Sequence, residues 1–136
     1  MAAPAPAVAR AVARRDLLFW LVLFIGVTTV ATGLSEVVAP GVVLDALGAG
    51  KTDTSRQLFA TVGMFMVVVG GGLTHALFVA GDHRVLLLWA GLQKLGAVIA
   101  VSAGVARGVF RTAALLVALN DLVSSGLVFW YRRRAS

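Results

Sequence analysis

The sequence predicts an all-α integral membrane protein that folds as an antiparallel four-helix bundle. Hydrophobic residues make up 60% of the 136 residues and charged residues 13%, whereas a soluble domain is about half apolar and about a quarter charged. Four apolar runs are each long enough for a membrane span, which needs about 20 residues. No segment shows the alternating pattern of a strand, and short turns between successive helices favour an antiparallel bundle.

The first span is predicted over residues 17–39, after an Ala/Pro-rich tail at 1–16 that ends in arginines. Basic residues before an apolar run also occur in signal peptides. This run is too long for a signal-peptide core of about 7–15 residues, so we interpret it as a span. Pro40 ends the helix because proline lacks the backbone N–H that a continuing helix needs.

Three further spans follow the longest connection, residues 41–56, whose first half carries a short apolar patch suited to the membrane surface. Tight turns, GDHR at 81–84 and RGVFR at 107–111, separate these spans. The predicted spans are 57–80, 85–106 and 112–131, and a basic tail at 132–136 completes the chain.

Basic residues in the short loops predict the orientation, because they favour the cytoplasmic side. The side with both termini and the 81–84 turn carries seven basic residues, and the other side carries four. The first group is Arg10, Arg14, Arg15, Arg84, Arg132, Arg133 and Arg134, and the second is Lys51, Arg56, Arg107 and Arg111. We therefore expect a multi-pass protein of the cytoplasmic (inner) membrane with both termini in the cytoplasm. The basic flanks suit anionic lipid headgroups, and no polar domain offers a nucleic-acid site.

Lys94 lies near the middle of the third span, where an isolated charge costs about 2.5–3.5 kcal/mol on insertion scales. Asp121 lies at nearly the same depth on the fourth span, which runs in the opposite direction. Small residues beside each of them allow the two helices to approach closely. The sequence therefore predicts a buried Lys94–Asp121 pair. Two interpretations remain: a structural pair that fixes helix register, or a proton-responsive or ligand-binding pair.

Other polar residues form a predicted strip inside the bundle beside this pair. They are Gln93, Asn120, Ser125, Glu36, His75 and Thr32. By depth, Glu36 is expected near the outer interface, where it meets water or Arg56. A single histidine in a span, without a second ligand at metal spacing, favours a packed or hydrogen-bonded side chain. The chain has no cysteine, and we expect neither a metal nor a cofactor.

Small residues predict close helix packing in two spans. They are Gly71 and Gly72 in the second span, and Gly96, Ala100 and Gly104 in the third. The third span is then packed on two sides, by neighbours within the bundle or by a partner subunit in a complex or homo-oligomer. The glycines of the second span would also leave room for a lipid or quinone-like ligand beside Lys94.

Several features resemble the DoxX-like group of small bacterial four-helix membrane proteins. They are the stretch from Gly33 to Pro40 that closes the first span, the Leu47–Gly48 loop, the GDHR turn and the small residues of the third span. The resemblance implies a helper or subunit role, in some members beside membrane oxidoreductases and quinone chemistry. It transfers no catalytic residue to this chain.

The sequence thus favours an accessory or interaction subunit of a membrane complex, and leaves open whether the protein is an enzyme. One alternative is a lipid-phase isomerase or cyclase that uses Asp121 or Glu36 as its acid. The other is a small oligomeric transporter in which Asp121 takes up protons. An enzyme needs a ligand-sized pocket around the acid, whereas a transporter needs a water path to both sides.

Overall fold

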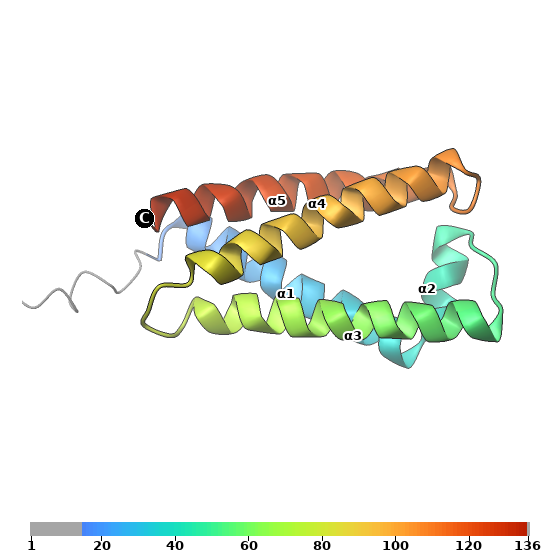
Figure 1. The fold of residues 1–136 in the computed structure, drawn as a ribbon, viewed down its shortest axis with the longest axis horizontal. Coiled ribbons are helices and arrows are strands. Elements are labelled where there is room, and N and C mark those ends of the chain that lie inside the picture. Colours follow the sequence, from blue (N-terminus) through green and yellow to red (C-terminus); the bar gives the residue numbers. More distant parts are fainter. Residues whose placement is uncertain (1–14, 136) are drawn as a thin grey trace, which may run out of the picture.

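The computed structural model describes residues 15–135, which form an all-α fold (Figure 1). Four long helices are accompanied by a short helix and one turn of 3₁₀-helix. The elements are α1 (Leu17–Val38), α2 (Pro40–Leu47), α3 (Asp53–Ala76), α4 (Arg84–Ala106), η2 (Thr112–Ala114) and α5 (Leu115–Arg134). Nearly all of the predicted 1–16 tail lies outside the described residues.

The first predicted connection contains a helix, α2, that the sequence analysis did not anticipate. Proline ends α1 as expected, and the same Pro40 then occupies the first turn of α2, where the missing N–H would lack a partner anyway. Helix α2 ends at Gly48, which has a left-handed backbone with φ 69°. Glycine adopts this conformation without the steric cost that a Cβ brings.

Helix α3 begins four residues before the predicted span because of a capping box. The Thr52 side chain accepts a hydrogen bond from the Ser55 N–H, and the Ser55 side chain accepts one from the Thr52 N–H. These bonds satisfy backbone donors that a helix start leaves free. Helix α5 likewise extends beyond 131 to Arg134, where basic side chains suit the negative end of the helix dipole.

Helices α1 and α3 form one antiparallel pair, held at short range by glycines. A Cβ built on Gly33 would lie 2.6 Å from the carbonyl oxygen of Gly63, and one built on Gly70 would lie 2.9 Å from that of Gly26. No side chain fits at these positions without moving a backbone. The four glycines therefore set the distance between the helices, in the way small residues do in membranes.

Helices α4 and α5 form the second antiparallel pair. The Ser125 hydroxyl on α5 donates a hydrogen bond of 3.1 Å to the carbonyl oxygen of Gly91 on α4. The Phe129 ring lies where a side chain on Gly91 would otherwise be. The small residue at 91 therefore admits both the hydroxyl and the ring.

The two pairs meet mainly at one end of the bundle, here called the terminal end, where α1 begins and α5 finishes (Figure 1). Its apolar core consists of Leu18, Val22, Ile25, Leu73, Leu87, Ala90 and Val128. Arg134 also pairs with Asp16 at 3.0 Å. All four long helices contribute to this core, so the terminal end joins the two pairs.

The pairs separate toward the opposite end, here called the α2 end, and α2 stands between them (Figure 1). The backbone N–H of Arg111, in the loop after α4, donates a hydrogen bond of 2.8 Å to the carbonyl oxygen of Leu47. The Arg111 side chain packs against Gly48 at the end of α2. Helix α2 therefore bridges the α1–α3 pair to the α4–α5 pair where the long helices do not meet.

Four helical segments are long and apolar enough to cross a membrane: Leu17–Val38, Asp53–Ala76, Arg84–Ala106 and Thr112–Arg134. Large apolar side chains also cover the outside of the bundle, among them Phe24, Phe65, Ile99 and Leu116. The chain is therefore a multi-pass membrane protein by helix composition, and its outer surface suits contact with lipid. The cytoplasmic location of both termini stays a prediction.

Candidate functional site

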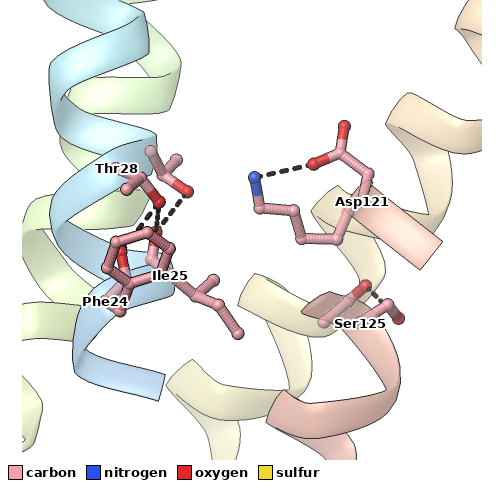
Figure 2. Close-up of polar contacts among 8 residues, drawn as sticks. Phe24, Ile25, Thr28, Asp121 and Ser125 are labelled. Atoms are coloured by element: carbon pink, nitrogen blue, oxygen red, sulfur yellow. Dashed lines mark hydrogen bonds and ion pairs between the residues drawn. The ribbon is translucent and has the colours of Figure 1, made fainter. Parts of the chain in front are cut away.

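Lys94 and Asp121 meet inside the bundle, at the depth where the sequence analysis expected a pair. The Lys94 Nζ donates a hydrogen bond of 2.9 Å to Asp121 Oδ1, and each side chain is 9% exposed. Figure 2 shows this contact, with Asp121 facing the side of the bundle where Thr28 of α1 lies. Both residues lie close to the middle of the helical segments that are long enough to cross a membrane, Arg84–Ala106 and Thr112–Arg134.

Small side chains make this pairing possible. Ala90 lies one turn before Lys94, and Ala118 and Ser125 lie on the same face of α5 as Asp121. All three are at most 5% exposed. With no bulky group between the backbones, a lysine on α4 reaches an aspartate on α5 without leaving the helix–helix interface.

Glu36 is a third buried ionisable group, and its placement corrects an expectation. The sequence analysis placed it at the outer interface with water or Arg56, but the residue is only 6% exposed. The Arg56 guanidinium lies beside Gly41 instead. The reason is the α1–α3 contact: Gly63 lies directly against Glu36, so the close approach of the helices turns this face of α1 inward.

The Glu36 carboxyl has no hydrogen-bond donor for one of its oxygens. Oε2 is buried and makes no hydrogen bond among the described residues, although Glu36 lies within electrostatic range of both Asp121 and Lys94. The amide oxygen Oε1 of Gln93, next to Lys94, is also buried without a donor. Buried polar atoms are rarely left unpaired in proteins. Two buried oxygens, one on Glu36 and one on Gln93, are therefore left without a donor among the described residues.

The charges of the cluster are also unequal. Two buried carboxyl groups, Glu36 and Asp121, share the bundle interior with one buried ammonium, Lys94. These three residues, here called the cluster, carry one net negative charge when all are ionised. A net charge inside a membrane is costly. A proton or a bound cation would remove both the charge and the missing donor. Within residues 15–135, no group of three or more histidine, aspartate or glutamate side chains is placed to hold a metal ion.

The remaining polar residues of the predicted strip do not join the cluster as a group. Ser125 serves the α4–α5 contact through its bond to Gly91. His75 is exposed near the end of α3, and Thr32 and Asn120 are exposed on α1 and α5. Of the predicted polar residues, four therefore remain as candidate site residues. Lys94 and Asp121 form the ion pair, and Glu36 and Gln93 each have a buried oxygen without a donor.

The predicted helix-packing residues also need correction within this chain. A Cβ on Gly71 or Gly96 would meet no atom within 4 Å, and Ala100 is exposed. Gly72 faces Leu86 of α4, and Gly104 accommodates Phe110 from the following loop. The α1–α3 contact instead depends on Gly26, Gly33, Gly63 and Gly70. Their spacing of seven residues on each helix was the signal that could have identified them.

Comparisons with known proteins identify no family for this chain. No family model matches the sequence, and no curated protein or solved structure is similar to it. The resemblance to the DoxX-like group therefore extends to the architecture of four membrane-spanning helices and no further.

Proposed function

We propose that this chain is a small proton-coupled membrane transporter whose exchangeable proton is held by the Glu36–Lys94–Asp121 cluster. The observation that carries the proposal is the buried Glu36 oxygen Oε2, which has no donor. A proton on Glu36 would neutralise the extra negative charge. Loss of that proton would leave a site for a cation, which is the elementary step of proton–cation exchange.

A purely structural pair does not account for Glu36. Lys94 and Asp121 neutralise each other at 2.9 Å, and such a pair alone can fix the register of α4 against α5. The second carboxyl group, Glu36, adds a desolvation cost, and its buried Oε2 gains no hydrogen bond among the described residues. Intramembrane acids of this kind are functional candidates because they are expensive to bury.

An accessory-subunit role is a second proposal, favoured by a different observation. Gly96 and Ala100 of α4 face away from the chain's own helices, and small residues on an outer face allow another helix to pack closely. A second copy of the chain or another membrane protein would fit there. Association with an oxidoreductase or a quinone rests on the DoxX-like resemblance alone. The enzyme alternative would require a ligand-sized pocket around Glu36.

Infrared difference spectroscopy of the protein in lipid bilayers, recorded across pH steps, tests the proton site directly. The wild type should show a carboxylic C=O band that appears and disappears with pH. Glu36→Gln should lose this band, while Asp53→Asn should keep it because Asp53 is an exposed acid at the start of α3. A band that persists in Glu36→Gln, or the lack of any titrating band in the wild type, would exclude Glu36 as the proton carrier.

A further inference from the structure

Helices α1 and α5 pack together at the terminal end and diverge toward the α2 end (Figure 1). On α5, Val128 belongs to the apolar core with Leu18 and Val22 of α1. Ser124 and Asn120 follow on the same face at successive four-residue steps. Ser124 is 6% exposed, whereas Asn120 is exposed. The edge of this face of α5 is therefore exposed two turns further on, while Asp121 beside it stays buried.

The facing strip of α1 shows the same change. Ile25 and Thr29 are buried on this strip, and Thr32 on the same strip is exposed. Glu36 follows one turn later and is buried, with its free oxygen Oε2. The Asn120 side chain makes no hydrogen bond within the described residues, although it lies in a helix apolar enough to span a membrane. Two uncovered polar residues, Thr32 and Asn120, therefore flank the α1–α5 interface beside the cluster.

A ligand for this place has to satisfy three conditions. It must supply a hydrogen-bond donor, because the buried Glu36 oxygen Oε2 lacks one. It must be positively charged, because the ionised cluster carries one net negative charge. It must also tolerate the surrounding lipid, because the polar residues that flank the site face outward within apolar helices. A protonated amine on an alkyl chain meets all three conditions, since an ammonium has three N–H donors.

From this juxtaposition we infer that the cluster binds the head group of an alkylammonium amphiphile, which enters from the bilayer between α1 and α5. The inference rests on the proposed proton–cation exchange and names its cation. The ammonium donates to Glu36 Oε2, the buried oxygen without a donor. Thr32 and Asn120 border its path, and the alkyl chain stays in the lipid. Binding takes place when the Glu36 proton has left, so amine and proton compete for one carboxylate.

Spin-labelled amphiphiles in bilayers that contain the protein provide the test. Three probes of equal chain length carry an ammonium, a hydroxyl or a carboxylate head group, and electron paramagnetic resonance measures the fraction that the protein immobilises. The wild type should prefer the ammonium to the hydroxyl probe by about 10- to 100-fold, the value of a charge-assisted hydrogen bond. In Glu36→Gln, the immobilised fractions of the ammonium and hydroxyl probes should differ by no more than about twofold. Glutamine keeps an acceptor oxygen but lacks the negative charge that strengthens the bond to an ammonium.

Thr32→Trp tests the route of entry, because an indole would fill the α1–α5 interface beside Glu36. It should weaken immobilisation of the ammonium probe by about tenfold or more. A probe that cannot enter cannot donate its hydrogen bond to Glu36, and one good hydrogen bond is worth about that factor. Val68→Trp is the matched control, since Val68 lies on α3 with its side chain 65% exposed to the outside; it should leave immobilisation unchanged. The Thr32 variant also provides a readout if Glu36→Gln does not fold.

Equal immobilisation of the three probes by the wild type, or an unchanged ammonium preference in Glu36→Gln, would overturn the inference. Equal binding by Thr32→Trp and Val68→Trp would overturn entry between α1 and α5. A Glu36 infrared band that titrates without any ammonium preference would leave the proton site in place and remove the alkylammonium. If the wild type shows neither a titrating Glu36 infrared band nor a preference for the ammonium probe, the proposed function is wrong.

Discussion

The two ends of the bundle are built from different chemistry, although the same four long helices pass through both. At the terminal end, apolar side chains from all four helices form one core, and the pairs are in contact. Toward the α2 end, the pairs diverge (Figure 1), and the buried residues include Glu36, Lys94 and Asp121. The apolar contacts that stabilise this fold and the residues of its candidate function therefore lie in different parts of the same helices.

The physical reason is the difference between apolar and polar packing inside a membrane. Apolar side chains and glycines bring helices together without regard to direction, and they tolerate no gap. Charged groups need partners at defined positions, and an unpartnered one marks a place where something else can bind. The buried core of the terminal end has the first kind of contact. Toward the α2 end, the Glu36 oxygen Oε2 is buried without a hydrogen-bond donor.

The largest expected effect comes from breaking the Lys94–Asp121 pair. Lys94→Met and Asp121→Leu should each lower the free energy of unfolding by about 3–5 kcal/mol, because each leaves a buried charge without its partner. The double variant should recover most of that loss, since an apolar pair of similar volume replaces the ion pair. Unfolding in mixed detergent micelles measures all three. Single-variant losses that simply add would show that the two residues are not coupled.

The double variant also separates structure from function in this half of the molecule. If the pair only fixes helix register, Lys94→Met with Asp121→Leu should keep both stability and proton exchange. If the proposed function is correct, stability returns and proton exchange is lost. The infrared band of Glu36 then measures the difference.

The next effect concerns the glycines that join α1 to α3. Gly63→Ala should lower the free energy of unfolding by about 1–3 kcal/mol, the usual cost of overpacking, because its Cβ would lie 2.5 Å from the Gly33 carbonyl oxygen. Gly126→Ala is the control, since a Cβ there meets nothing within 4 Å. The same measurement in micelles compares them. Equal stability of the two variants would mean that the α1–α3 distance does not depend on Gly63.

A smaller effect is expected inside the α4–α5 pair. Ser125→Ala removes the hydrogen bond to the Gly91 carbonyl oxygen, and interhelical bonds of this kind are worth about 0.6 kcal/mol in membrane proteins. Ser102→Ala, at a half-buried position of α4, is a control of the same chemistry. A loss above about 2 kcal/mol would exceed that range and would show that Ser125 also supports Asp121.

The smallest effect lies at the terminal end, where Arg134 pairs with Asp16. Arg134→Ala should lower the free energy of unfolding by less than about 1 kcal/mol, because both side chains are largely exposed and the pair is screened by salt. Raising the ionic strength in micelles should remove the difference from the wild type. A loss that persists at high salt would indicate that Arg134 acts through packing on Trp130, which its guanidinium covers at 5.1 Å.

The sequence by itself determined the number of long helices and their antiparallel order. Apolar runs of span length between short turns leave few other arrangements in a membrane, because every backbone polar group must be satisfied within its helix. It also placed Lys94 and Asp121 at one depth, since two spans joined by a short turn fix each other's height. Helix boundaries were less certain, because capping at Thr52 and a proline that starts α2 depend on local bonds.

Only the tertiary structure decided which faces of the helices meet. The depth of Glu36 along α1 is readable from the sequence, but its burial depends on the rotation of α1 against α3, which the contact of Gly33 with Gly63 fixes. A sequence shows where small residues lie and leaves open which partner helix they face. Gly71 and Gly96 therefore looked like contact residues and meet no side chain of this chain. The rotation set by the glycines turns an expected interfacial glutamate into a buried third charge.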